Sequence, residues 1–302
     1  MTLPRIGVFD SGVGGLTVLK AMAEQLPAHY LYFGDTARLP YGAKSAETVA
    51  RYAISAARFL EAQKIDLLVI ACNTATALAL PAIKAAAHVP VVGVVEPGAA
   101  AAAQVSGHRA AIVIATEATV TSHAYRDALQ QHGLRAVEKA CPLLVPLVEE
   151  GWIEHPVTEQ VAKIYLNEAM AQAPDGADVL VLACTHYPLI SPMLRRIVPE
   201  KMQIVDSAES TARVVTKMIE EIMKGHPERS DGAGNDSLCQ PERSDDAPAS
   251  ERGRRTPIAP RTPADPRTFR FYVTDSTEKF KRLAAQFLGR AVDNVERIDL
   301  GN

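Results

Sequence analysis

Two cysteines in matching contexts are the residues of this 302-residue chain best placed to do chemistry. Cys72 ends the segment Asp66–Cys72, DLLVIAC, and Cys184 ends the segment Asp178–Cys184, DVLVLAC. Each apolar run is followed by a threonine-containing turn and a segment with helical character, so each cysteine is predicted to lie between a buried strand and a helix. A helix N-terminus favours the thiolate over the thiol, which suits both positions to reactive cysteines.

Two thiols that face each other across a cleft could move a proton on and off a carbon centre. One thiolate would take a proton from one face of a stereocentre, and the other thiol would return a proton to the opposite face. The same pair could instead be a redox pair, or could bind zinc together with His186, but the chain has no CxxC pair and no metal-ligand spacing. Two structural cysteines in similar buried strands are the remaining alternative. The pattern favours acid–base chemistry without a metal.

The elements that must position these cysteines follow an α/β pattern, in which short apolar runs alternate with helical segments. Besides the cysteine segments, Ile6–Ser11 resembles Ala111–Thr116, and Pro90–Glu96 resembles Met202–Ser207. This repeat predicts two pseudo-symmetric lobes, each a mainly parallel sheet covered by helices, with the active site in the cleft between them. The predicted strands are Ile6–Phe9, Tyr30–Phe33, Leu67–Ala71, Val91–Val95, Ala111–Ala115, Val179–Ala183, Gln203–Val205, Phe269–Val273 and Val295–Leu300.

The predicted domain boundaries follow from where the repeat ends. Residues 1–97, 208–224 and 269–302 are assigned to the first lobe, and residues 98–207 to the second. Residues 225–268 contain seven prolines, a repeated PERSD sequence and no aromatic residue, so they are predicted to form a disordered insertion rich in Pro, Arg and Ser. Its arginines could attract an anionic partner, but the interspersed acids favour a solvated linker.

Composition excludes several classes of partner. The net charge of −3 at pH 7 and the pI near 6.3 give no reason to expect binding to nucleic acid or to an anionic membrane. The apolar stretch 65–83 contains Asp66, Asn73 and Pro81, which indicates a buried strand, turn and helix instead of a membrane span. The four cysteines lie far apart, and no signal-peptide pattern follows Arg5. We predict a cytoplasmic protein with a small-molecule ligand.

The segment Asp10–Gly15, DSGVGG, lies between a predicted strand and a predicted helix and is similar to a phosphate-binding loop. A dinucleotide-binding fingerprint has glycine where Thr17 stands, and Asp10 would place a negative charge beside the pyrophosphate. Asp35 lies at a sequence distance suited to a ribose contact. Nucleotide binding is therefore an alternative that the incomplete motif disfavours.

Five segments together resemble the glutamate racemases, in the order typical of that family and across nearly the whole chain except the predicted insertion. The resemblance implies racemisation of L-glutamate to D-glutamate without a cofactor, by a two-thiol acid–base mechanism that supplies D-glutamate for peptidoglycan synthesis. It also implies a homodimer. Aspartate and hydantoin racemases look similar near the cysteines but lack this combination. The five segments are Val8–Thr17, Phe33–Gly42, Ala71–Thr74, Cys141–Gly151 and Leu182–His186.

The resemblance also implies the roles of individual residues. Cys72 and Cys184 would be the two acid–base catalysts, with Asp10 assisting one thiol and His186 and Glu149 the other. Glu150, next to Glu149, stays open as the acidic assistant. The implied substrate contacts are Asp10, Ser11, Tyr41, Gly42, Asn73, Thr74, Thr185 and His186.

Two other functions remain open. A cysteine-dependent lyase or decarboxylase would need only one thiol for protonation, so the paired cysteines argue against it. A non-catalytic binding protein with a two-lobed amino-acid cleft is the other alternative, and the absence of an export-signal pattern argues against a periplasmic version of it. Measuring D-glutamate after incubation with L-glutamate distinguishes these functions.

Overall fold

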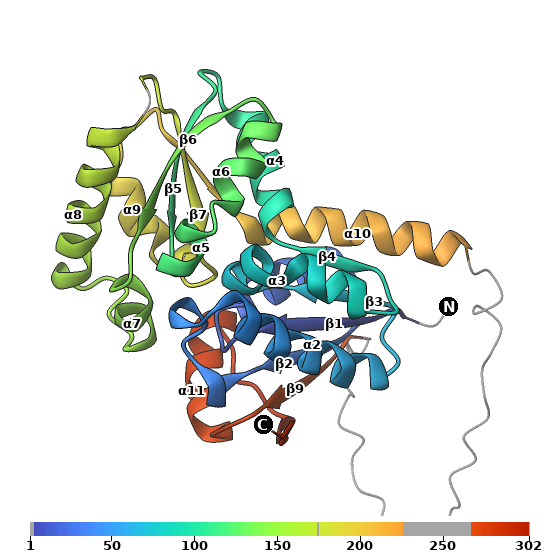
Figure 1. The fold of residues 1–302 in the computed structure, drawn as a ribbon. Coiled ribbons are helices and arrows are strands. Elements are labelled where there is room, and N and C mark those ends of the chain that lie inside the picture. Colours follow the sequence, from blue (N-terminus) through green and yellow to red (C-terminus); the bar gives the residue numbers. More distant parts are fainter. Residues whose placement is uncertain (1–2, 174, 226–266, 302) are drawn as a thin grey trace, which may run out of the picture.

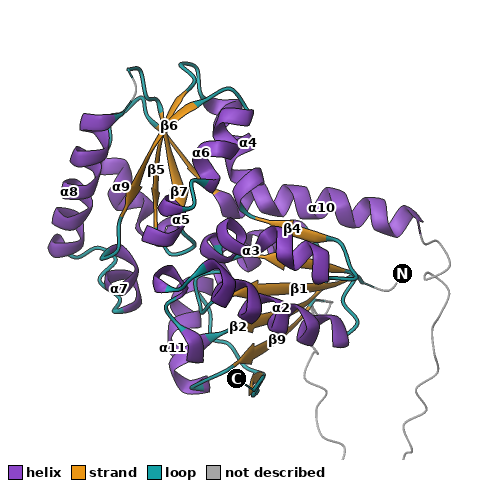
Figure 2. Ribbon diagram, in the orientation of Figure 1, coloured by secondary structure: helices purple, strands orange, loops and turns teal. Residues whose placement is uncertain are grey.

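Two parallel β-sheets, each covered by helices, make up the fold (Figures 1 and 2). The computed structural model describes residues 3–173, 175–225 and 267–301. The first sheet has the strand order β10-β9-β2-β1-β3-β4, and the second has the order β6-β5-β7-β8. The first sheet consists of β1 (Arg5–Asp10), β2 (His29–Gly34), β3 (Leu67–Ile70), β4 (Val91–Gly93), β9 (Thr268–Val273) and β10 (Val295–Arg297). The second consists of β5 (Ala110–Ala115), β6 (Arg135–Ala140), β7 (Val179–Ala183) and β8 (Gln203–Asp206).

The helices lie on both faces of each sheet (Figure 2). Those that follow the strands of the first lobe are α1 (Leu16–Gln25), α2 (Ala46–Ala62), α3 (Asn73–Ala86) and α11 (Thr277–Leu288). The helices α4 (Val95–Val105) and α10 (Ser207–Gly225) pack on each other where the chain passes between the lobes. The second lobe carries α5 (Glu117–Thr121), α6 (Ala124–Gln131), α7 (Leu144–Glu149), α8 (Pro156–Gln172) and α9 (Ser191–Ile197). Short 3-10 turns are η1 (Thr36–Arg38), η2 (Tyr41–Ala43) and η3 (Tyr187–Ile190).

The strand orders confirm the predicted two-lobed α/β fold. The order β2-β1-β3-β4 in the first sheet is repeated as β6-β5-β7-β8 in the second, and all the strand pairings of the described residues are parallel. Strands β3 and β7 are therefore equivalent, and both are buried along their whole length because helices cover both faces. Cys72 and Cys184 follow these two strands at the carboxyl edges of the sheets.

Several predicted strand boundaries were wrong. Strand β6 was not predicted, because it lies at the edge of its sheet and its residues are exposed or only partly buried. Val91–Val95 was predicted as strand throughout, but β4 ends at Gly93 and Val95 begins α4. The predicted strand to Leu300 is shorter, since β10 ends at Arg297.

The ends of the segment predicted to be disordered, 225–268, belong to regular elements. Helix α10 continues through Gly225, and β9 begins at Thr268, which pairs with His29 of β2. The side chains of His29 and Thr268 also hydrogen-bond at 2.8 Å, which explains why strand structure starts earlier than composition indicated. Residues 226–266 lie outside the described part of the chain. The predicted division between residues 97 and 98 falls inside α4, so this boundary stays a prediction.

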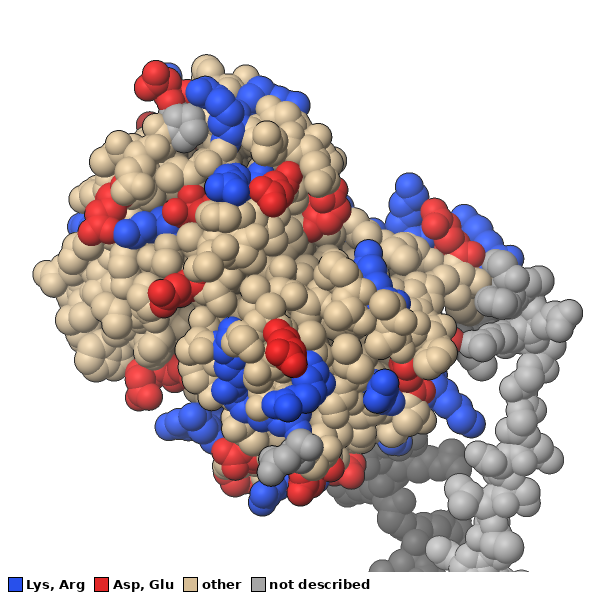
Figure 3. Space-filling view, viewed as in Figure 1, with Lys and Arg blue, Asp and Glu red and all other residues tan. Residues whose placement is uncertain are grey.

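Charged side chains of both signs lie on the face shown in Figure 3. On the face shown in Figure 3, Lys and Arg are interspersed with Asp and Glu on both lobes. Among the described residues, no helix combines the length and the apolar character needed to cross a bilayer.

Candidate active site

Both cysteines line one cavity of about 490 Å³ between the lobes. Cys72 is the N-cap of α3, and Cys184 directly follows β7; their exposed fractions are 5% and 6%. The cavity brings together all of the predicted site residues except Asp10, which does not form part of its wall. The predicted residues that line it are Ser11, Tyr41, Gly42, Cys72, Asn73, Thr74, Glu149, Cys184, Thr185 and His186.

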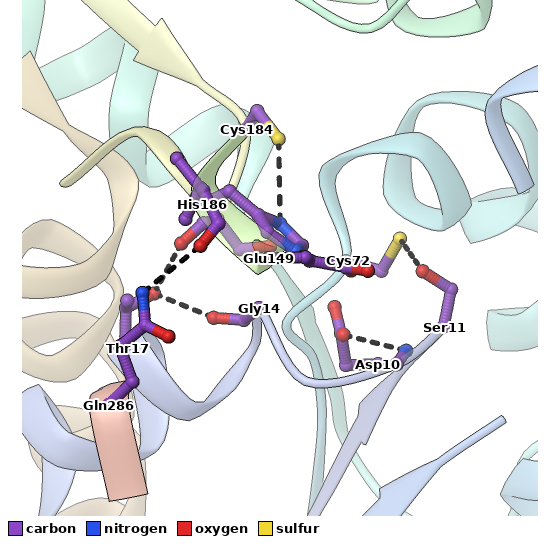
Figure 4. Close-up of polar contacts among 12 residues, drawn as sticks. Asp10, Ser11, Gly14, Thr17, Cys72, Glu149, Cys184, His186 and Gln286 are labelled. Atoms are coloured by element: carbon purple, nitrogen blue, oxygen red, sulfur yellow. Dashed lines mark hydrogen bonds and ion pairs between the residues drawn. The ribbon is translucent and has the colours of Figure 1, made fainter. Parts of the chain in front are cut away.

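The Cys72 thiol is held in its protonated form. Burial raises its pKa to about 12, and the nearby charge of Asp10 adds to the effect. Hydrogen bonds with Ser11 Oγ and the Ala75 N–H, each 3.4 Å long, favour the thiolate but do not outweigh burial (Figure 4). The sequence-based expectation that the helix N-terminus lowers this pKa was therefore wrong for Cys72. In neutral solution Cys72 is a proton donor.

The environment of Cys184 differs from that of Cys72. His186 lies next to the Cys184 thiol, and Glu149 is bonded to the far side of the His186 ring (Figure 4). His186 Nδ1 lies 3.9 Å from Cys184 Sγ, and His186 Nε2 hydrogen-bonds Glu149 Oε1 at 3.0 Å. Burial opposes the charged imidazole, but the bonds to Cys184 and Glu149 and their charges raise the pKa of His186 to about 10. Burial likewise opposes charge on Glu149, yet His186 holds its pKa below the ordinary value. His186 is therefore charged at neutral pH and lies beside the Cys184 sulfur.

Asp10 is a buried carboxylate at the end of β1, on the Cys72 side of the site. Its exposed fraction is 1%, and its Oδ2 accepts a hydrogen bond from Gly12 N at 2.8 Å (Figure 4). Its Oδ1 has no hydrogen-bond partner in the described part of the chain. Burial raises the pKa of Asp10, with the Gly12 N–H and the charge of His186 opposing this effect. Asp10 can thus act on Cys72 by its charge or accept a proton.

The two lobes touch at Gly14, in the loop between β1 and α1. A Cβ atom placed there would lie 2.6 Å from His186 Nδ1 and even closer to Thr185 Oγ1. A hydrogen bond joins the lobes at the same place. The Thr17 hydroxyl donates to the Thr185 carbonyl oxygen at 3.1 Å (Figure 4). Only glycine allows the backbone at residue 14 to come this close to the side chains of Thr185 and His186.

One wall of the cavity is held by a buried carboxylate that was not predicted as a site residue. Asp35 is fully buried and accepts hydrogen bonds from the Tyr41 hydroxyl at 2.6 Å and from the Thr274 hydroxyl at 2.9 Å. Arg38 completes the arrangement, 3.5 Å from Asp35 and hydrogen-bonded to the Gly301 carbonyl. Asp35 therefore supports the wall that contains Tyr41 and Gly42, in place of the ribose contact considered from sequence.

The cavity also contains residues that sequence reasoning missed. The hydroxyl of Thr74 lies 2.9 Å from that of Thr116 and 3.3 Å from that of Thr119. The repeat contained the signal, since Thr116 follows β5 as Ser11 follows β1. Further lining residues that were not predicted are Gly12, Leu39, Pro40, Ala43, Glu117, Pro142, Val145, Pro146 and Lys279.

The two acidic candidates differ in their contact with His186. Glu150 lines the cavity too, but the carboxylate bonded to His186 is that of Glu149. In the described ranges, no group of three or more His, Cys, Asp or Glu residues is arranged to hold a metal ion.

The fold and this site define a two-lobed α/β protein in which each lobe contributes one cysteine to a shared cavity. The Asp/Glu/Hydantoin racemase family matches residues 6–215. The chain belongs to this family and, within it, groups with the glutamate racemases, so it is an isomerase. A glutamate racemase of Koribacter versatilis (strain Ellin345) is 56% identical over 303 residues, which cover 99% of this chain and 98% of the relative.

Solved structures agree with this assignment. The glutamate racemase of Thermus thermophilus in complex with beta-chloro-D-alanine has a TM-score of 0.76 and 41% identity, and the match covers 98% of this chain and 97% of that one. A glutamate racemase of Bacillus anthracis has a TM-score of 0.79 and 32% identity, with 98% of both chains covered.

Proposed function

We propose that this enzyme interconverts L- and D-glutamate by passing the α-proton between Cys184 and Cys72. The observation that carries the proposal is the pairing of one thiol from each lobe at a single cavity, with the buried Asp10 on the Cys72 side and the His186–Glu149 pair beside Cys184. The names of relatives up to 56% identical support glutamate as the substrate.

The reaction requires a base on one face of the α-carbon and an acid on the other. In the proposed cycle Cys184 acts as the base and takes the α-proton, with His186 Nδ1 3.9 Å from its sulfur. The Cys72 thiol then gives its proton to the opposite face, so that the carbanion becomes the other enantiomer. Cys184 is left as thiol and Cys72 as thiolate, which is the state that the reverse reaction needs. By resemblance, Cys184 removes the proton of L-glutamate and Cys72 that of D-glutamate.

The cavity offers hydrogen-bond donors and few cations for the two carboxylates of glutamate. Ser11, Asn73, Thr74 and Thr185 present hydroxyl or amide groups, and α3 begins at the cavity with its first backbone N–H groups. Among the described lining residues, Lys279 is the cation besides His186. The substrate contacts assigned to Asp10, Tyr41 and Gly42 in the sequence analysis remain part of the proposal.

Replacing each cysteine singly with alanine tests the mechanism. Cys72→Ala and Cys184→Ala should lose racemisation, because each direction needs an acceptor on one face and a donor on the other. In deuterated water the surviving thiol can still exchange the α-hydrogen on its own face, so the two variants should label opposite enantiomers. Cys141→Ala is the matched control, since Cys141 is buried in the second lobe but does not line the cavity. A folded single variant of Cys72 or Cys184 that racemises at close to the parental rate would rule that cysteine out.

A second test concerns cofactors. No lysine lies in the motifs around the two cysteines to form a Schiff base with pyridoxal phosphate. We expect full activity after exhaustive dialysis against a chelator, measured as D-glutamate formed from L-glutamate. Restoration of a dialysed, inactive enzyme by a metal ion or by pyridoxal phosphate would contradict the thiol mechanism. The role in peptidoglycan synthesis, the cytoplasmic location and the homodimer also remain proposals.

A further inference from the structure

A buried hydrogen bond joins the lobes directly behind Cys72. Tyr125, on α6 of the second lobe, is completely buried, and its hydroxyl donates to Asn73 Oδ1 at 2.6 Å. Asn73 is the first residue of α3 in the first lobe and lines the cavity. Tyr125 itself does not line the cavity, so it can influence a ligand only through another residue.

The Tyr125 bond determines which end of the Asn73 amide is free. With Oδ1 occupied by the tyrosine, Nδ2 is a buried donor without a partner among the described residues. A buried polar group without a partner destabilises the fold, and a ligand that bonds to it removes this cost. Asn73 lines the cavity, and an amide donor on its side chain matches an anionic oxygen, as in a carboxylate.

The surroundings of Tyr125 keep its hydroxyl a donor. Burial raises the pKa of Tyr125, so the phenol is protonated at neutral pH, while a hydrogen bond with Ser207 partly offsets burial. A Cβ atom added at Gly98 would lie 3.2 Å from the Tyr125 hydroxyl and 3.4 Å from Ser207 Cβ. The hydroxyl therefore sits in a narrow space formed by the first turns of α4 and α10, the two helices between the lobes.

We propose that Tyr125 is a positioning residue, which holds the Asn73 amide with Nδ2 available to a substrate carboxylate. Because Tyr125 and Asn73 belong to different lobes, the amide is fixed in this way only while the lobes are closed on each other. The inference rests on the proposed function, since it takes a carboxylate of glutamate as the ligand.

The test compares Tyr125→Phe with the wild-type enzyme in both directions of racemisation. Phenylalanine fills the same space but leaves Asn73 Oδ1 unbonded, so the amide can rotate. We expect KM to rise about tenfold, which corresponds to about 1.4 kcal/mol, while kcat changes less than about threefold. Tyr30→Phe is the control, because Tyr30 is also buried and donates to the Leu26 carbonyl, away from the cavity. KM and kcat of this control should match the wild type.

A double-mutant cycle distinguishes positioning from a general structural role. If Tyr125 acts through Asn73, then Tyr125→Phe should have no further effect on KM in the Asn73→Ala background. Additive effects of the two changes, or an equal loss of kcat with unchanged KM, would overturn the proposal. Absence of glutamate racemisation in the wild-type enzyme would instead reject the proposed function.

Ser207→Ala provides a second variant in case Tyr125→Phe does not fold. This change removes the group that hydrogen-bonds the Tyr125 oxygen, so we expect KM to rise in the same direction by about threefold. If Tyr125→Phe is unfolded and Ser207→Ala has the wild-type KM, Tyr125 has only a structural role and the proposal fails.

Discussion

Replacing Glu149 with glutamine tests whether this carboxylate keeps His186 charged. The bond from His186 Nε2 to Glu149 Oε1 is 3.0 Å long, and it is one of the interactions that raise the pKa of His186 to about 10. A hydrogen bond to a charged group contributes about 1.5–3 kcal/mol, and about 1.4 kcal/mol changes a pKa by about 1. Glutamine provides only an uncharged acceptor. We therefore expect the pKa of His186 to fall by about 1 to 2, to between about 8 and 9.

The order of the pKa values decides which group ends activity at high pH. The pKa of His186, about 10, is lower than that of Cys72, about 12, so loss of the imidazolium precedes ionisation of the Cys72 thiol. The alkaline limb of kcat/KM should therefore move to lower pH in Glu149→Gln, while the two enzymes stay within a few fold at pH 7. If the pKa falls to about 8, the charged fraction of His186 at pH 9 is about tenfold lower than in the wild type.

The assay is kcat/KM for both enantiomers between pH 6 and 10.5. L- and D-glutamate have equal free energies in water, so kcat/KM must be equal in the two directions for every variant, which checks the data internally. The substrate ammonium group titrates identically with each enzyme and cancels from the comparison. Glu150→Gln is the control, and its alkaline limb should stay in place. An unmoved limb in Glu149→Gln, or a shift only in Glu150→Gln, would refute the reasoning.

The same pair predicts how stability depends on pH. The pKa of His186 is higher in the folded protein than its ordinary value of 6.5, so its contribution is fully present below about pH 6.5 and is lost as the pH rises through about 10. The pKa of Glu149 is lowered from 4.5, so its contribution is present above about pH 4.5 and is lost in more acidic solution. The difference in Tm between wild type and Glu149→Gln should be largest between about pH 4.5 and 6.5. A difference in Tm that grows towards pH 10 would contradict this predicted pH dependence.

Two further variants test the packing around the cavity. Gly14→Ala should lower kcat/KM by at least about 100-fold in a folded protein. The new methyl group would collide with Thr185 and His186 and separate the lobes. Near-normal activity would show that the close contact at residue 14 is not needed for closure of the lobes. Asp35→Asn should lower the free energy of unfolding, measured with urea, by about 1–3 kcal/mol, and should raise KM. The reason is that the hydroxyls of Tyr41 and Thr274 lose a charged acceptor. Unchanged stability would show that the charge of Asp35 is unimportant.

The sequence predicted those parts of the fold whose side chains are uniformly buried. Strands β3 and β7 are covered on both faces and appear as continuous apolar runs, so they and their repeat could be found. Strand β6 could not, because Arg135, Glu138 and Lys139 interrupt this edge strand and no apolar run forms. The end of β4 was missed since Val94 and Val95 are as apolar as a strand but begin a helix.

Site residues could be predicted where they directly follow a strand. They could not be predicted where only tertiary packing brings them to the cavity. The motifs around Cys72 and Cys184 marked their neighbours along the chain, which the structure places at one cavity, although the roles assigned to them stay predictions. Lys279 and Tyr125 lie on helices far from these motifs, and no spacing in the sequence connects them with the cavity. The pKa of Cys72 was predicted in the wrong direction, because burial and the charge of Asp10 depend on folded geometry.

The first sheet contains strands from opposite ends of the chain, so it cannot be completed until nearly the whole chain has been synthesised. Strand β2 pairs with β9, and the partners His29 and Thr268 are 239 residues apart, whereas all four strands of the second sheet lie between Ala110 and Asp206. On the ribosome the second lobe can fold as soon as residue 206 has emerged, while the first must keep the edge of β2 unpaired until β9 is synthesised. We expect nascent chains that end near residue 225 to contain a protease-resistant second lobe beside an incomplete, chaperone-accessible first one.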